Sequence, residues 1–229
     1  MKITIIHGQS HEGSTCHMAR MVADKIGGDV TEFFLPRDFG EFCCGCTSCI
    51  VKSHDKCPHY EKLKPLTDAL DEADVIILES PVYVYHCTGS MKAFLDHYGY
   101  RWMVHRPDER MFKKQVVCVA SAAGAGLKST LKDMADSAYF WGCAKIYKFG
   151  VAVQATSWNG VSDKIMKKIE TKSSAIAGKV KNNHGKAKPS FKTKAFFNLM
   201  SMIQKNGWNE ADVVYWREKD WIGKARPWK

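Results

Sequence analysis

The chain has 229 residues, of which 45% are hydrophobic and 25% are charged, a composition typical of a globular protein that builds its own core. No apolar run reaches the ~18–20 residues that cross a bilayer, and the opening MKITIIHGQS does not resemble a signal peptide. We therefore expect a cytoplasmic protein without a membrane span. The net charge is +10, and all of the excess lies from residue 161 onward. The positive charges of this basic tail could lie on a solvated helix face, attract an anionic cofactor or bind nucleic acid.

The first 155 residues alternate between short β-rich runs and helical stretches. The central strands are apolar on both faces, as in a parallel sheet covered by helices on either side. This pattern predicts an α/β fold with a doubly wound, five-stranded parallel sheet in the flavodoxin-like order 2-1-3-4-5. We expect strands at Lys2–His7, Val30–Leu35, Val75–Ser80, Gln115–Ser121 and Ile146–Val153, and helices at Ser14–Ile26, Glu61–Glu72, Ser90–Tyr100 and Lys128–Trp141.

A further helix, at about Asp163–Lys181, is expected to close a domain spanning residues 1–185. Residues 186–229 then form a basic C-terminal extension with a short helix at Ala195–Gln204. Four of the seven tryptophans of the chain lie in its last 22 residues. Because so many aromatic side chains rarely stay in water, we expect the extension to cover the domain or a partner subunit.

The first loop follows the first strand and leads directly into a helix. Its small and hydroxyl-bearing residues, together with the positive end of the helix dipole, suit a terminal phosphate. The fingerprints of dinucleotide-binding and P-loop proteins are absent. The alternative is an ordinary turn in which Ser14 caps the helix. The candidate phosphate-binding residues are Gln9, Ser10, Gly13, Ser14 and Thr15.

A cysteine-rich insertion at residues 43–57 contains the pattern Cys43-x2-Cys46-x2-Cys49-x7-Cys57-Pro58, with Cys44 in addition. Four closely spaced thiolates followed by proline are typical of [4Fe–4S] ligation. Zinc also accepts four thiolates, and free thiols or a regulatory disulfide are further alternatives. The candidate metal ligands are Cys43, Cys46, Cys49 and Cys57.

The loops after the third and fourth strands suit a flat ring. A rigid proline followed by aromatic residues ends the third strand, and small residues that allow close backbone approach end the fourth. With the first loop, they meet at the topological switch point of the predicted sheet, where such folds bind ligands; the alternative is that all three merely turn the chain. The candidate ring-binding residues are Pro81, Val82, Tyr83, Tyr85, Ala122, Ala123, Gly124 and Ala125.

These motifs carry a resemblance. Ser10-x-x-Gly13-x-Thr15 resembles the phosphate loop of flavodoxin-like FMN proteins. Ser80-Pro81-Val82-Tyr83, followed by Lys92-Ala93-Phe94-Leu95-Asp96, resembles the flavin loop of the NADPH-dependent FMN reductase and NAD(P)H-quinone oxidoreductase families. The cysteine-rich insertion makes iron–sulfur flavoproteins the most similar members. The first loop departs from the Ser-Pro-Arg of the reductases, because it has Gln9-Ser10-His11 and lacks the arginine.

The resemblance implies an enzyme that passes electrons from NAD(P)H through FMN to a quinone, a flavin or an iron–sulfur acceptor. A [4Fe–4S] cluster beside the flavin would transfer single electrons. We assign no catalytic acid or base, because the protein would mainly orient and tune the flavin. Tyr83, Tyr85, His86 and Trp102 are candidates for lining the exposed side of the ring, and a homodimer is expected. The alternatives are a flavodoxin-type electron carrier and a basic nucleic-acid-associated protein.

Overall fold

The computed structural model describes residues 1–229. Its sheet has five parallel strands in the order β2-β1-β3-β4-β5. The predicted doubly wound sheet and its order are thereby confirmed. The switch point lies between β1 and β3, whose register begins with the pair Ile3 and Val75. The strands are β1 (Lys2–His7), β2 (Asp29–Phe34), β3 (Val75–Pro81), β4 (Gln115–Ala122) and β5 (Lys145–Ala152).

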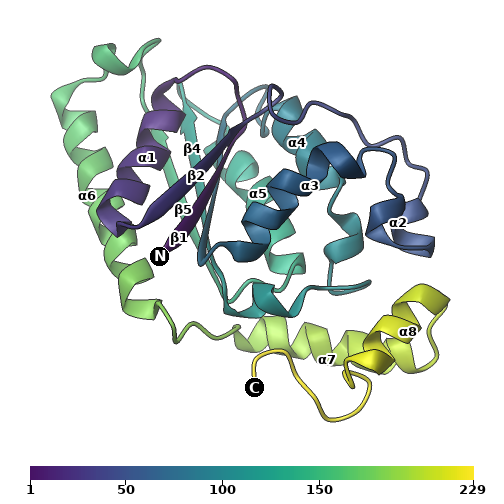
Figure 1. Cartoon of the computed structure of the whole chain (residues 1–229). Coiled ribbons are helices and arrows are strands. Elements are labelled where there is room, and N and C mark those ends of the chain that lie inside the picture. Colours follow the sequence, from purple (N-terminus) through teal and green to yellow (C-terminus); the bar gives the residue numbers. More distant parts are fainter.

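Helices cover both faces of the sheet (Figure 1). One face carries α1 (Ser14–Ile26) and α6 (Asp163–Asn183), and the other carries α3 (Tyr60–Glu72), α4 (Gly89–Asp96) and α5 (Leu127–Phe140). Each face therefore has its own apolar core. The central strands β3 and β4 are buried almost throughout, while the edge strand β2 is half exposed. This difference explains why β3 and β4 are continuous apolar runs.

Some elements differ from the sequence-based expectation. The helix expected to reach Tyr100 ends at Asp96, and a short 3-10 turn, η2 (Gly99–Arg101), follows it. Two helices were not predicted, α2 (Ser48–Val51) inside the cysteine-rich insertion and α8 (Glu210–Glu218) near the C-terminus. The remaining 3-10 turns are η1 (His54–Lys56), η3 (Glu109–Lys113) and η4 (Trp158–Gly160).

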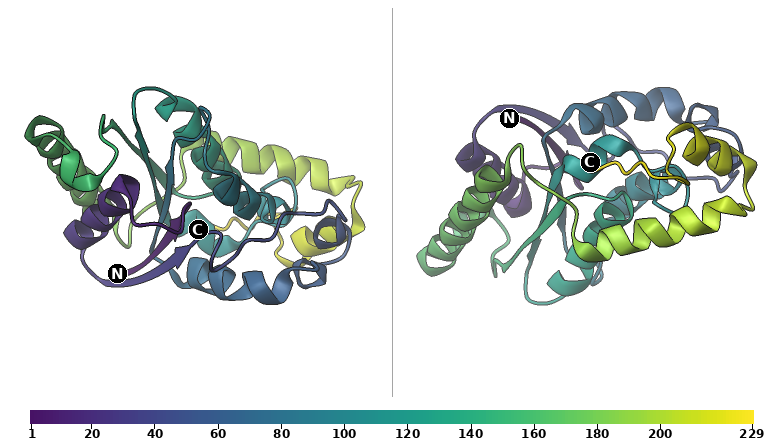
Figure 2. Two further views of the ribbon diagram at one scale, coloured as in Figure 1. Left: turned by 90° about the horizontal axis from the view of Figure 1, so that it is seen from above. Right: turned by 90° about the horizontal axis from the view of Figure 1, so that it is seen from below.

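The C-terminal extension packs against the same chain. Helix α7 (Phe191–Lys205) starts at Ser190, whose hydroxyl accepts a hydrogen bond from the Thr193 N–H at 3.1 Å. It is longer than predicted because this cap starts it four residues earlier. Figures 1 and 2 show α7 lying beyond the amino ends of the strands, whereas α8 lies beside α2 of the cysteine-rich insertion.

The extension and the domain share a third apolar core. Phe197 and Trp216 are fully buried there, together with Met103 and Phe112 of the domain. The aromatic side chains of the extension therefore cover the domain itself, one of the two options that the sequence left open. No helix in the structure combines the length and apolar character that crossing a bilayer requires.

Candidate flavin site and cysteine-rich loop

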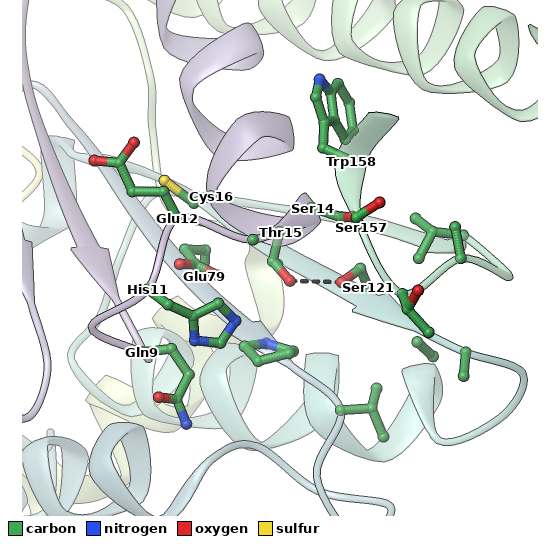
Figure 3. Close-up of a pocket in the computed structure, with 18 of the residues that line it drawn as sticks. Gln9, His11, Glu12, Ser14, Thr15, Cys16, Glu79, Ser121, Ser157 and Trp158 are labelled. Carbon is green, nitrogen blue, oxygen red and sulfur yellow. Dashed lines mark hydrogen bonds between the residues drawn. The ribbon is translucent and has the colours of Figure 1, made fainter. Parts of the chain in front are cut away.

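A pocket of about 420 Å³ lies at the carboxyl ends of β1, β3, β4 and β5 (Figure 3). This is the edge of the sheet, at the switch point, where doubly wound folds bind ligands. Its volume falls within the range of small-molecule and cofactor sites. The three loops that the sequence singled out converge here, and a fourth joins them.

The start of α1 opens into this pocket. Its N-cap residue, Gly13, offers no side-chain acceptor, and the backbone N–H groups of Ser14, Thr15 and Cys16 have no hydrogen-bond partner in the protein. Free N–H groups and the positive end of the helix dipole form a site for an anion. The Thr15 hydroxyl lies 2.5 Å from the Ser121 hydroxyl, which links this helix start to the end of β4 (Figure 3).

Among the predicted phosphate-binding residues, Gln9, Gly13, Ser14 and Thr15 line the pocket, whereas Ser10 does not. The Ser10 hydroxyl instead donates a hydrogen bond to the Leu35 carbonyl at 3.2 Å. Two further lining residues of this loop, which sequence reasoning passed over, are His11 and Glu12. The lining contains no lysine or arginine, so His11 is the only side chain in it that can carry a positive charge.

The loop after β3 forms one wall of the pocket and a projecting tip. Pro81, Val82 and Tyr83 line the pocket. Beyond them, Val84 and Tyr85 lie outside the lining and form the tip of a tight turn with φ of 48° and 66°. Val84 is 94% exposed. A β-branched residue with positive φ is a strained outlier, and such strain persists mainly at functional sites. The tip is therefore suited to contact a ligand or a partner rather than to stabilise the fold.

The loop after β4 lies close to the loop after β3. Ala122 and Ala123 line the pocket, while Gly124 and Ala125 lie outside its lining. Gly126 has φ of +90°, and a Cβ atom there would lie 2.4 Å from Val82 Cγ1. Only glycine permits both the conformation and this approach.

The fourth loop, after β5, was missed in the sequence analysis. It contributes Ala155, Thr156, Ser157 and Trp158 to the lining. The signal was present, because β5 ends at the same edge of the sheet as the other strands. Trp158 stacks on His17 with ring centroids 5.0 Å apart, whereas Trp102, a candidate in the sequence analysis, stacks on Phe140 away from this pocket.

A buried charge network lies beneath the first loop. His7 Nδ1 lies 2.9 Å from Glu79 Oε1, and His7 Nε2 lies 3.1 Å from Glu32 Oε1. Burial alone would lower the pKa of His7, but hydrogen bonds with Cys16 and Glu79 outweigh it and raise the pKa to about 10. Burial raises the pKa of Glu79. Arg20 also bonds Glu32, at 2.8 Å, and so ties α1 to β2.

The residues of the pocket fit FMN. The uncapped start of α1 suits the phosphate, and the loops after β3 and β4 form walls of apolar and small residues. Glu79 Oε2, buried in the lining, has no hydrogen-bond partner. A buried polar atom without a partner is costly, and a polar group of a bound ligand would satisfy it.

The four candidate metal ligands lie on one loop and influence each other. Burial, reinforced by the neighbouring thiolates of Cys57 and Cys43, raises the pKa of Cys49. Gly45 and Thr47 adopt positive φ, which curls the chain between Cys43 and Cys49. All nine cysteines are free thiols. A set of four thiols on one curled loop is compatible with a [4Fe–4S] cluster.

The C-terminal extension fastens this loop to the domain. Arg106 donates hydrogen bonds to the carbonyl oxygens of Cys49 and Ile50, the latter at 2.8 Å. Its guanidinium also pairs with Asp212 of α8, a fully buried carboxylate. Asn209 Nδ2 donates to the Ile50 carbonyl at 3.0 Å. The extension thus fixes the backbone that carries Cys49.

Comparison with known proteins shows which family shares these features. The profile of the NADPH-dependent FMN reductase family matches residues 1–156, which is more than half of the chain. An iron–sulfur flavoprotein from Archaeoglobus fulgidus is 27% identical over 205 residues, which cover 87% of this chain and 88% of that protein.

Two solved structures share the fold. A flavone reductase superposes with a TM-score of 0.59 at 21% identity, covering 83% of this chain and 66% of its own. The apo form of the NADH:FMN oxidoreductase EmoB superposes with a TM-score of 0.56 at 18% identity, covering 85% and 97%. The family match and the pocket geometry lead to the same conclusion: the chain belongs to the family of NADPH-dependent FMN reductases.

Proposed function

We propose that this flavin oxidoreductase takes electrons from NAD(P)H and passes them to a quinone, a free flavin or an iron–sulfur acceptor. The observation that carries the proposal is the uncapped start of α1, which opens into a pocket whose walls are the loops after β3, β4 and β5. When bound, FMN would supply the hydride acceptor and would also release electrons singly.

The residues of this chain would hold and orient the cofactor. The N–H groups and hydroxyls of Ser14 and Thr15 would bind the phosphate, with His11 as the only possible cation in the lining. Gln9 and Gly13 would complete this loop, while Ser10 would brace it through Leu35. Pro81, Val82, Ala122 and Ala123 would enclose the ring, and Glu79 would present its unpaired oxygen from the pocket lining.

The four cysteines would hold a [4Fe–4S] cluster as a single-electron relay. The support is the spacing of the cysteines on the curled loop and the likeness to an iron–sulfur flavoprotein. A second copy of the chain would supply the outer side of the flavin site, because the strained tip at Val84 and Tyr85 places two large side chains in solvent beside the pocket. The enzyme would work in the cytoplasm.

The test combines an absorbance spectrum with turnover. We expect the anaerobically purified protein to bind FMN and to oxidise NADH or NADPH when a quinone or free flavin is added. Ser14→Ala should weaken FMN binding about 10- to 100-fold, because it removes a hydrogen bond to a charged group. Ser174→Ala, on the exposed side of α6, is the matched control.

Two results would contradict the proposal. A protein that does not take up FMN would refute the site. A protein that binds FMN but oxidises neither nucleotide would instead be an electron carrier of the flavodoxin type.

A further inference from the structure

A second cluster of metal-binding side chains lies at the far end of α4 from the flavin pocket. Cys57, His59 and His97 each place a ligand atom within 4.8 Å of the other two. Cys57 closes the cysteine-rich loop, His59 precedes α3, and His97 follows α4. We propose that, when the cysteine-rich loop carries no cluster, these three residues bind a single divalent ion of the zinc class.

The imidazole tautomers suit a metal. His97 Nδ1 lies 2.7 Å from the Ala93 carbonyl, so it carries the proton and leaves Nε2 with its lone pair. Hydrogen bonds from the distal nitrogen to a backbone carbonyl are the usual way in which proteins orient a metal-binding histidine. His97 Nε2 faces His59 Nδ1 at 2.9 Å. The two nitrogens therefore face each other across the position that an ion would take.

The distance between the two histidine nitrogens is close to the separation that a bound ion would require. Zinc–nitrogen and zinc–sulfur bond lengths in a tetrahedral site imply about 3.4 Å between two ligand nitrogens and about 3.6 Å between nitrogen and sulfur. The observed nitrogen separation of 2.9 Å is a hydrogen bond in the metal-free protein. An ion would replace the proton shared by the rings and move them apart by about half an ångström.

The surroundings hold the ligands in place, and with three protein ligands the fourth position of a tetrahedral ion would be filled by water. His97 is 4% exposed and packs edge-on against Phe39 with ring centroids 4.9 Å apart. Glu41 Oε2 lies 4.0 Å from His59 Nε2, the nitrogen that faces away from His97. One thiolate and two imidazoles are typical of zinc or cobalt rather than magnesium or calcium.

The ion would join two segments of the chain and would compete with the proposed cluster for Cys57. It would tie the end of the cysteine-rich loop to α4, whose other end is anchored by the Thr88 hydroxyl donating to the Gly8 carbonyl at 2.7 Å. Because Cys57 belongs to both ligand sets, the zinc-class ion and a four-cysteine cluster cannot bind at the same time.

The test uses Co²⁺ as a spectroscopic probe on the full chain, reduced and free of metal. Cys43, Cys44 and Cys46 are exposed, and replacing all three with serine removes the four-thiolate site. We expect this triple variant to bind one Co²⁺, with a single thiolate charge-transfer band and the visible bands of a tetrahedral ion.

In that background, His59→Gln, His97→Gln and Cys57→Ser should each weaken Co²⁺ binding about a hundredfold or more. His54→Gln is the matched control, because His54 lies on the same segment outside the trio. A native far-UV circular dichroism spectrum and a cooperative thermal transition report that each variant is folded. His59 is partly exposed, so its variant serves even if replacement of the buried His97 unfolds the chain.

A second readout is thermal. Saturating Zn²⁺ should raise the melting temperature of the triple variant and leave that of its His59→Gln derivative unchanged. Absence of Co²⁺ binding, a spectrum without the thiolate band, or equal affinity in the His59→Gln variant would overturn the proposal. None of these outcomes depends on FMN binding or on NAD(P)H oxidation.

Discussion

Gly126→Ala perturbs the contact between the two loops that would enclose the flavin ring. Gly126 has φ of +90°, and the added Cβ would lie 2.4 Å from Val82 Cγ1 and 3.1 Å from Tyr85 Cα. Carbon atoms in contact are normally ~3.5–4.0 Å apart, so the overlap exceeds about 1 Å. The left-handed conformation costs a non-glycine residue about 1–2 kcal/mol, and overpacking adds about 1–3 kcal/mol.

The expected loss of unfolding free energy is therefore about 2–5 kcal/mol. In a chain of this size that lowers the melting temperature by at least about 4 °C. Because Val82 lines the flavin pocket, the strain should also weaken FMN binding. If about 1.4 kcal/mol of it acts on the pocket, the dissociation constant rises about tenfold.

The matched control is Gly124→Ala in the same loop, where an added Cβ meets no atom within 4 Å and φ is not in the left-handed region. Differential scanning fluorimetry and an FMN fluorescence titration measure both effects. If Gly126→Ala and Gly124→Ala have the same melting temperature and bind FMN equally well, the contact between these loops does not shape the site.

Three further predictions concern the buried charges and the extension. Asp212→Asn removes one partner of a buried ion pair and should lower the free energy of unfolding, measured by chemical denaturation, by about 3–5 kcal/mol. Asp68→Asn, at an exposed ion pair, should lower it by less than about 1 kcal/mol. Equal losses would contradict the role of Asp212 in fixing the cysteine-rich loop. The pKa of His7 is raised to about 10, so its stabilising contribution is complete below about pH 6.5 and is lost as the pH rises toward 10. Between pH 6 and pH 9.5 the free energy of unfolding, measured by chemical denaturation, should fall less for His7→Asn than for the parent protein. If it falls equally in both proteins, His7 is not charged in the folded state. Phe197→Ala empties a fully buried site between the extension and the domain and should cost about 3–5 kcal/mol, while Leu199→Ala, at an exposed position of the same helix, should change the melting temperature little.

The sequence alone was sufficient to predict the sheet and the edge at which its pocket lies. Apolar runs such as Val75–Leu78, alternating with helical stretches, have the pattern of strands covered on both faces. Once the order of the strands is known, residues that follow them must gather at one edge. Thr15, Val82 and Ala122 were found in this way, and they line one pocket.

Features that depend on contacts between distant segments could not be predicted from the sequence. Nothing near His7 indicates that Glu79, 72 residues away, would lie within hydrogen-bond distance of its ring. The pairing of Arg106 with Asp212 and the meeting of His59 with His97 likewise join segments brought together only by packing. Local patterns determine which faces of strands and helices are buried. The partners of individual side chains depend on how those faces pack, and only the tertiary structure decided them.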